Sequence, residues 1–294
     1  KERGFVLDIR SNPGGLLSQA VKVTDIFLER GEIVSTRGRE KKDIKRYRAK
    51  AGDYTKGKPL IVLINGGSAS ASEIVAGALQ DHRRAIIIGT QSFGKGSVQN
   101  LYPLDRYSRY KSEKGFGQMT LTIAKYYRVN GSGTQNKGVI PDITLPSFID
   151  EAVVGEENKN NTLPWDQIIG LDYTKDPDLE VTKSIITRNH QIREKDDPAI
   201  QYMNDEIDYF EKESEIDLIT LNYEKRLKRR DSKRDEVESR RTRKLLELGY
   251  DDDYDFDDFR DETILNQVYS VMLDMIMQKH QSASSISNVQ IDNS

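Results

Sequence analysis

The first half of the chain alternates continuous apolar runs with glycine turns and stretches of helical periodicity. Three runs have the pattern of strands buried on both faces: 5–9, 60–64 and 85–88. A glycine turn follows each of the first two runs, and apolar residues then recur at helical spacing over 17–28 and 70–79. The order strand, glycine turn, helix, strand predicts βαβ units and a partly parallel sheet, and therefore an α/β fold.

Four further segments belong to this half. Residues 32–50 are strand-like and strongly basic, which favours a surface hairpin over a nucleic-acid site because no aromatic stripe interleaves with the charges. Residues 97–101 also have a strand pattern, and the clean alternation from 119 to 126 predicts a half-buried strand. The composition of 130–140 (NGSGTQNKGVI) predicts a mobile loop near the end of the domain.

From about Phe148 the pattern becomes helical and highly charged. Asp197-Pro198 predicts a helix start, since proline is tolerated in the first turn. Residues 225–244 carry both signs of charge at the density of a solvated helix. An apolar stripe at helical spacing predicts a further helix that packs on a core. Its members are Leu265, Val268, Tyr269, Met272, Met275 and Ile276.

These patterns predict three parts: a core at 1–147, a helical, charge-rich domain at 148–280 and a disordered polar tail at 281–294. The acidic run 251–258 could bind calcium or serve as a linker. It lacks the spaced ligands, the central glycine and the terminal glutamate of an EF-hand loop, so a solvated linker is the stronger hypothesis.

Length and composition narrow the class of protein. The chain has 294 residues, enough for two domains, and its net charge of −3 gives no electrostatic case for nucleic acid. It contains no cysteine, which excludes a disulfide, a thiol nucleophile and a thiolate metal site. No apolar run approaches the ~18 residues that span a bilayer. The chain leads from Lys1 almost directly into a predicted strand, which is typical of a segment cut from a longer protein.

Ser70 lies at a strand–turn–helix junction, the position at which the nucleophile elbow of hydrolases exposes a serine hydroxyl. A nucleophilic serine needs a base. His82 is on the same predicted helix, roughly 18 Å further along its axis, so it cannot reach the serine. We expect this histidine on the surface at the helix end. Lys95, between Gly94 and Gly96, is the better candidate for the base.

A lysine acts as a base only when its amine is neutral, and the pKa of a free lysine amine is about 10.4. Burial in a dry, apolar pocket lowers such a pKa, because desolvation penalises the charged form. The flanking glycines would let the backbone thread Lys95 into such a pocket. Gln99 could accept a hydrogen bond from the amine and aim it. A serine–lysine pair is an accepted variant of the catalytic triad.

Two other interpretations of these residues involve no such chemistry. Ser70-x-x-Glu73 is also a capping box, which satisfies the free N–H groups of a helix start and, taken alone, is the commoner role. The run from Gly89 to Lys95 approaches a phosphate-binding P-loop. That motif requires Ser or Thr where this chain has Gly96, and it must open a helix rather than a strand.

Gly-Gly-Ser-Ala-Ser-Ala-Ser-Glu at 66–73, followed by Phe-Gly-Lys-Gly at 93–96 and by Gln99, resembles the carboxy-terminal processing proteases. The interval between Ser70 and Lys95 is also that of this family. The resemblance implies a crotonase/Clp-protease-like ββα core. It also implies that Ser70 is the nucleophile, that Lys95 is the general base and that Gln99 orients the lysine. No metal or organic cofactor is implied.

The glycine turn at 12–15 also has a counterpart in this family. There, such a turn supplies one oxyanion-hole amide and the residue after the nucleophile supplies the other. The corresponding residues here are Gly15, with Gly14 as the alternative, and Ala71. Exposed N–H groups at a glycine turn can bind an anion on general grounds. Without the resemblance, a plain glycine turn is an equally good interpretation.

Leu-Pro-Trp-Asp at 163–166, ahead of the charged helical region, resembles the long, tail-specific type of this family. The resemblance implies a periplasmic enzyme of the cell envelope, made with a signal peptide, that degrades proteins with apolar or disordered C-terminal tails. It also implies a helical-repeat lipoprotein adaptor. Family members carry a PDZ domain and the opening strand and helix of the core ahead of the equivalent of residue 1. We therefore expect the chain alone to be inactive.

The sequence thus predicts a serine endopeptidase that acts through a Ser70–Lys95 dyad and an acyl-enzyme. Two alternatives stay open. A crotonase-like acyl-CoA enzyme has a related fold and an oxyanion hole but needs neither residue of the dyad. A catalytically idle fragment could instead act as a binding module.

Overall fold

The computed structural model describes residues 2–50, 52–110, 113–148, 154–171, 173, 177–214 and 218–291. Contacts divide the chain into two units. The first runs to Thr144 and resumes for the stretch that ends at Lys183, and the second comprises Leu145–Phe148 and the chain from Ser184 onward. The contact boundary therefore differs from the predicted boundary at residue 148, because part of the predicted helical domain packs with the first unit.

The first unit is built on a parallel sheet, as predicted. Its strands lie in the order β1 (Phe5–Asp8), β4 (Leu60–Ile64), β5 (Ile86–Gly89) and β8 (Ile143–Thr144). Every neighbouring pair is parallel. All residues of β4 are buried, which accounts for the continuous apolar run in its sequence.

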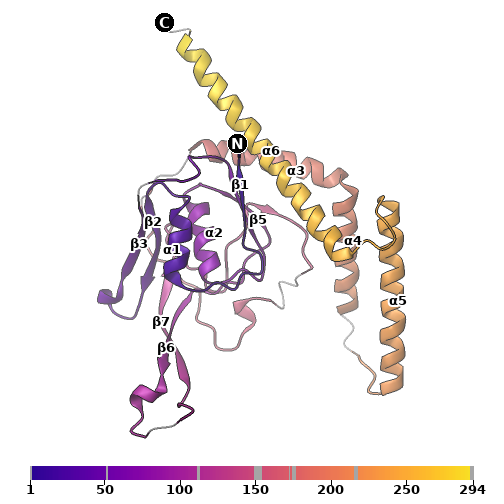
Figure 1. Ribbon diagram of the computed structural model, residues 1–294, viewed down its shortest axis with the longest axis horizontal. Coiled ribbons are helices and arrows are strands. Elements are labelled where there is room, and N and C mark those ends of the chain that lie inside the picture. Colours follow the sequence, from indigo (N-terminus) through magenta and orange to yellow (C-terminus); the bar gives the residue numbers. More distant parts are fainter. Residues whose placement is uncertain are drawn as a thin grey trace. The chain divides into compact units, whose positions relative to one another are not determined.

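Two helices, α1 (Leu17–Asp25) and α2 (Ala71–Asp81), follow β1 and β4 and lie side by side (Figure 1). The start of α2 directly after Ser70 is as predicted. α1 ends earlier than its periodicity predicts. The Phe27 carbonyl accepts a hydrogen bond from Arg84 Nε at 3.0 Å.

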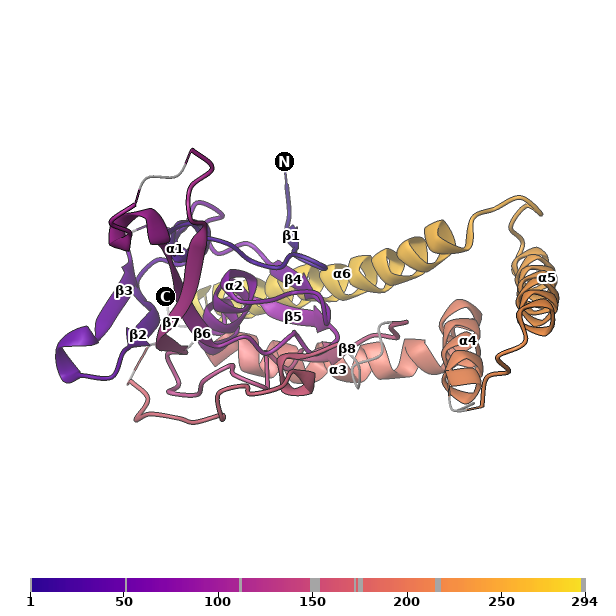
Figure 2. The same cartoon turned by 90° about the horizontal axis from the view of Figure 1, so that it is seen from below.

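The second sheet of this unit is antiparallel, in the order β3 (Lys45–Ala49), β2 (Gly31–Arg37), β7 (Gln118–Tyr127) and β6 (Ser97–Pro103). β2 and β3, joined through the short helix η1 (Lys41–Asp43), form the hairpin that the sequence predicts, and Figure 2 shows it extending from the unit. The predicted surface position is wrong for β2, of which five residues are buried, whereas β3 is mostly exposed. β6 and β7 form a longer hairpin that projects in Figure 1.

The prediction of a half-buried strand over 119–126 is wrong for most of β7. Met119, Leu121 and Ile123 are 44%, 46% and 40% exposed. Only the end of the strand is buried, where Tyr126 and Tyr127 lie beside β2. The outer part of β7 pairs with β6 alone, so neither of its faces meets a second layer in the described residues.

The prediction of a mobile loop over 130–140 is also wrong. Thr134, Gln135 and Val139 are buried. Glycine in this stretch serves close packing: a Cβ on Gly131 would overlap the Ile168 carbonyl oxygen. Composition alone cannot distinguish a glycine that gives freedom from one that admits a neighbouring backbone.

The second unit is helical, as predicted. Its helices are α3 (Pro177–Asp196), which begins within the first unit, α4 (Pro198–Ser214), α5 (Tyr223–Glu247) and α6 (Phe256–Ile291). The predicted start of α4 is confirmed, since Asp197 Oδ1 accepts the N–H of Ala199 at 2.9 Å. The predicted charged helix within 225–244 is also confirmed as part of α5.

Aromatic rings form much of the core of the second unit. The Phe148 and Phe256 rings lie 5.7 Å apart, and those of Tyr202 and Phe259 lie 5.6 Å apart. In α6, the stripe residues Val268, Met272 and Met275 are buried, as predicted, whereas Tyr269 is exposed.

The tail predicted to be disordered continues α6 as far as Ile291, and residues 292–294 lie outside the described residues. A formed helix adds one hydrogen bond for each further residue fixed, so polar composition by itself does not end it.

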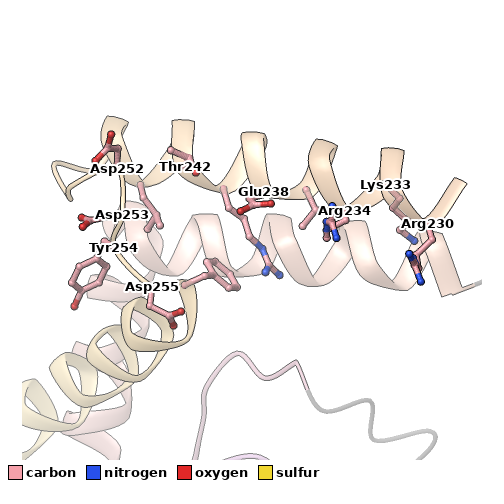
Figure 3. A pocket seen from close by; sticks show the side chains of 13 residues that line it. Arg230, Lys233, Arg234, Glu238, Thr242, Asp252, Asp253, Tyr254 and Asp255 are labelled. Carbon is pink, nitrogen blue, oxygen red and sulfur yellow. The ribbon is translucent and has the colours of Figure 1, made fainter. Parts of the chain in front are cut away.

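The acidic residues that precede α6 and basic residues of α5 line a shared cleft of about 640 Å³. Figure 3 shows Arg230, Lys233 and Arg234 along the helix and Asp253 and Asp255 near its far end. The described residues contain no group of three or more acidic or histidine side chains that could share a metal ion. They also contain no helix long and apolar enough to cross a membrane.

Candidate active site

Ser70 forms the tip of a sharp turn between β4 and α2. Its backbone angles, φ 55° and ψ −109°, lie in a region that residues other than glycine rarely adopt. Strain of this kind is characteristic of a nucleophile elbow, in which the turn lifts the serine hydroxyl away from the sheet. The geometry is that expected from the sequence.

Hydrogen bonds join the glycine turn after β1 to this elbow. Asn65 Oδ1 accepts the N–H of Ser11 at 2.7 Å. The Asn12 carbonyl accepts both the N–H of Ala69 at 3.0 Å and the hydroxyl of Ser72 at 3.0 Å. These bonds therefore hold the turn after β1 and the turn after β4 together as one structure. Ser70 lies between Ala69 and Ser72, which both bond to the first turn.

The two candidate oxyanion glycines differ in what their N–H groups do. Gly14 donates to Asn12 Oδ1 at 2.9 Å, and a Cβ on it would lie 2.5 Å from the Ala69 carbonyl oxygen. Gly14 therefore provides close contact between the two turns. The N–H groups of Gly15 and Ala71 have no acceptor among the described residues, and both residues line the same cleft. That pair is available to an oxyanion.

Glu73 connects the elbow to the loop that carries Lys95. Its carboxylate is buried and accepts the N–H of Ser70 at 2.6 Å, of Gly94 at 2.7 Å and of Lys95 at 2.9 Å, together with the hydroxyl of Ser92 at 2.6 Å. Burial raises the pKa of Glu73 to about 7, against the opposing effect of these hydrogen bonds. One carboxylate thus holds the backbone of both proposed catalytic residues.

The other backbone groups around Lys95 are also satisfied. The Tyr126 hydroxyl lies 2.8 Å from the Lys95 carbonyl oxygen and 3.1 Å from that of Ser70. Three further bonds complete positions 94–96: Asn136 N to Gly94 O at 2.7 Å, Gly96 N to Gln135 Oε1 at 3.0 Å, and Tyr126 N to Gly96 O at 3.0 Å. All six N–H and C=O groups of these positions therefore have partners, as buried backbone groups require.

The amine of Lys95 contacts Gln99, the residue that the sequence pairs with it. Lys95 Nζ lies 3.3 Å from Gln99 Oε1. Gln99 Nε2 in turn donates to Thr122 Oγ1 on β7, also at 3.3 Å. Nothing in the sequence identified Thr122, since the register between β6 and β7 decides its place beside Gln99.

The candidate residues meet in a cleft of about 1000 Å³. Ser70, Lys95 and Gln99 line it together with Gly15 and Ala71. Part of its wall is apolar and is formed by Leu17, Ile74, Val98, Leu101, Ile123 and Ala124. The arrangement combines a hydroxyl, an amine and two free N–H groups in a groove large enough for an extended chain.

His82 is buried, which contradicts the expectation of a surface position. It caps the far end of α2 from Ser70, and its Nε2 lies 2.7 Å from the Glu32 carbonyl oxygen. The β2 strand covers this helix end, an arrangement that the local sequence does not reveal. The distance argument against a histidine base holds, because the two residues lie at opposite ends of α2.

Comparison with known protein families finds two matches that follow each other along the chain. Residues 1–145 match the model of peptidase family S41. Residues 149–277 match the model described as the C-terminal domain of tail specific protease.

The chain is also similar to curated proteins. It is 59% identical over 155 residues to the carboxy-terminal-processing protease of Bartonella bacilliformis, and the matched stretch covers 53% of this chain and 34% of that protein. It is 35% identical over 256 residues to the tail-specific protease of Haemophilus influenzae, and the matched stretch covers 84% of this chain and 35% of that protein. The chain spans about a third of the length of these relatives.

Among solved structures, a photosystem II D1 C-terminal processing protease is 34% identical to the chain with a TM-score of 0.43. The match covers 53% of this chain and 40% of that one.

Proposed function

Because the chain belongs to peptidase family S41, we propose that it carries the catalytic dyad and the helical domain of a serine endopeptidase of the tail-specific type. One observation carries the proposal. Ser70 and Lys95 line the same cleft, and a single buried carboxylate binds the backbone N–H groups of both.

In the proposed reaction, the Ser70 hydroxyl attacks the peptide carbonyl carbon while the neutral amine of Lys95 takes its proton. The N–H groups of Gly15 and Ala71 donate to the carbonyl oxygen as it becomes negative. The lysine then returns the proton to the leaving amine, the peptide bond breaks, and an acyl ester stays on the serine. A water molecule, deprotonated by the lysine, hydrolyses this ester and restores the free hydroxyl.

The surroundings support this assignment of roles. Gln99 accepts a hydrogen bond from the amine and is itself held by Thr122, so the amine has a preferred direction. Gly15 is a better oxyanion donor than Gly14, because the N–H of Gly14 is engaged within its own turn. None of these steps needs a metal ion or an organic cofactor.

The apolar part of the cleft wall supports substrates with apolar or disordered C-terminal tails, since only an unstructured chain can enter the groove in extended form. By the resemblance of 163–166 and of the helical half to the tail-specific type, we further propose a periplasmic location and a helical-repeat lipoprotein adaptor. These two proposals rest on the resemblance alone.

The test is degradation of a disordered protein with an apolar C-terminal tail by the full-length protein, compared with Ser70→Ala, Lys95→Ala and the double variant. Each single change should abolish cleavage, and the double variant should lose no more, because the two residues act as one unit. Covalent labelling by a serine-directed probe should disappear in Ser70→Ala. Cleavage that persists in Ser70→Ala would refute the dyad.

The same variants separate the alternatives. Turnover of an acyl-CoA thioester that survives both substitutions would favour a crotonase-like enzyme. Tight binding of the tailed protein without cleavage or labelling would favour a binding module.

A further inference from the structure

Residues 163–171, here called the strap, lie along the loop 129–137 of the first unit. Their backbones are joined at three points: Gly133 N to Asp166 O at 3.1 Å, Ile168 N to Gly131 O at 2.8 Å, and Leu171 N to Val129 O at 3.0 Å. Glycine permits this approach on both sides, since a Cβ on Gly131 or on Gly170 would overlap the opposite backbone. The loop and the strap thus form one packed layer.

Side chains fasten the same layer. The ring of Trp165 lies 3.5 Å from the ammonium group of Lys137, and its Nε1 donates to the Gly133 carbonyl at 2.8 Å. The Tyr127 hydroxyl donates to Asp166 Oδ2 at 3.1 Å. Together these contacts join the strap to both the loop and the end of β7.

The loop beneath the strap is the one that holds the backbone on either side of Lys95. Asn136 donates its N–H to the Gly94 carbonyl at 2.7 Å, and its side-chain Nδ2 donates to the Leu163 carbonyl of the strap at 3.1 Å. The buried Gln135 accepts the N–H of Gly96 at 3.0 Å. A chain of direct contacts therefore runs from the strap, through Asn136 and Gln135, to the loop of the proposed base.

From these contacts we infer that the strap positions the general base: Trp165 and Asp166, acting through Asn136 and Gln135, hold residues 94–96 so that the Lys95 amine stays directed into the cleft. The inference rests on the proposed function of Lys95. The strap lies outside the part that matches family S41 and inside the part that matches the tail-specific C-terminal domain. That domain would thus contribute directly to the catalytic geometry.

Two variants of different severity test this in the full-length protein. Trp165→Ala removes the ring contact and the indole hydrogen bond, and Tyr127→Phe removes only the bond to Asp166. The matched control is Lys58→Ala, which removes another contact between a lysine and an aromatic ring. Lys58 Nζ lies 5.7 Å from the centre of the Phe5 ring. Lys58 precedes β4 and is therefore at the end of that strand away from the elbow.

The first measurement is hydrogen exchange, which does not depend on activity. In Trp165→Ala, amide exchange in a peptide covering 93–99 should become at least tenfold faster while exchange in β4 stays unchanged. Tyr127→Phe should show a smaller change in the same peptide, and Lys58→Ala should show none. Faster exchange throughout the first unit would indicate a merely structural role and would overturn the inference, as would unchanged exchange in 93–99.

The second measurement is steady-state cleavage. In Trp165→Ala, kcat should fall roughly tenfold with KM changed less than twofold, since a misplaced base slows the chemical step but leaves the cleft intact. In Tyr127→Phe, amide exchange in a peptide covering 163–171 reports whether the strap stays docked. If the strap is released and kcat is unchanged, the inference is wrong. If the wild type cleaves nothing, the proposed function fails, and the exchange result still decides the link to the base loop.

Discussion

Glu73 illustrates how one side chain can serve both proposed catalytic residues. Its four hydrogen bonds come from the elbow and from the loop 92–95, which meet only in the folded chain. As a capping-box residue it would bind the Ser70 N–H alone. The structure therefore assigns it a wider positioning role than the sequence indicated.

The charge of Glu73 makes stability depend on pH. The pKa in the folded protein is about 7, above the ordinary glutamate value of 4.5, so the folded state binds the proton more tightly. The stabilising effect of this proton is complete below pH 4.5 and is lost as the pH rises through 7, by about 3 kcal/mol from this group. We expect Glu73→Gln to remove this component, measured as a flatter dependence of unfolding free energy on pH between 5 and 8. An unchanged slope would contradict the assignment.

Glu73→Gln should also slow catalysis. An amide offers one acceptor oxygen where the carboxylate offers two, so some of the N–H groups of Ser70, Gly94 and Lys95 lose their partner. Each lost bond to a charged group is worth about 1.5–3 kcal/mol. We expect kcat to fall at least tenfold with KM little changed. Ser92→Ala, which removes one donor to the same carboxylate and no backbone contact, should have a smaller effect.

Lys95→Arg tests whether the base must become neutral. A guanidinium keeps its proton at any pH at which proteins fold, so it cannot accept one from Ser70. We expect complete loss of cleavage with the melting temperature preserved. Substantial cleavage by this variant would exclude the lysine as general base.

At the scale of elements, the contact between the turn after β1 and the elbow before α2 depends on Gly14. A Cβ there would lie 2.5 Å from the Ala69 carbonyl oxygen and 2.7 Å from the Ala71 N. We expect Gly14→Ala to push the turns apart and to lower kcat by about a hundredfold, since a shift of about 1 Å at the oxyanion donors is enough. Gly117→Ala is the control: its φ is also positive, at 81°, but nothing lies within 4 Å of the added Cβ. Equal losses in both variants would contradict this explanation.

The exposed part of the β6–β7 hairpin offers a test of substrate binding. Ile123 lines the cleft and is 40% exposed, so Ile123→Ser should cost little stability. It should raise KM for an apolar tail several-fold, corresponding to about 1 kcal/mol of lost apolar contact. Met119→Ser is the control, because Met119 is similarly exposed on the same strand but does not line the cleft. An equal change in KM for both would show that the cleft wall does not bind the tail.

At the scale of the whole molecule, the two units have separate cores. Phe259 is fully buried among the aromatic rings of the second unit, so Phe259→Ala should destabilise that unit by about 3–5 kcal/mol. The first unit, which contains the strap, should keep its fold. We expect scanning calorimetry to show one transition moved to lower temperature while a serine-directed probe still labels Ser70. Loss of labelling together with the shifted transition would show that the units fold as one.

The periodicity of the sequence determined the elements that are buried by their own composition. The run 60–64 has no polar residue to present to water, so it forms the centre of the parallel sheet. The glycine turns and the spacing of Ser70 and Lys95 likewise identified the candidate dyad, because these features are local. The helix start near Ser70 followed from the apolar periodicity after the glycine turn, and the start at Asp197 followed from the proline in the first turn.

Tertiary structure decided whatever depends on which surfaces meet. Alternation in β7 predicted a buried face, yet no second layer among the described residues covers most of that strand. The glycines of 130–140 indicated mobility, yet they admit the strap, and His82 is buried because β2 covers its helix end. The four groups that donate hydrogen bonds to Glu73 likewise come together only in the folded chain. The periodicity of a segment shows which of its side chains could be buried. Whether they are buried depends on which other element packs against them in the folded chain.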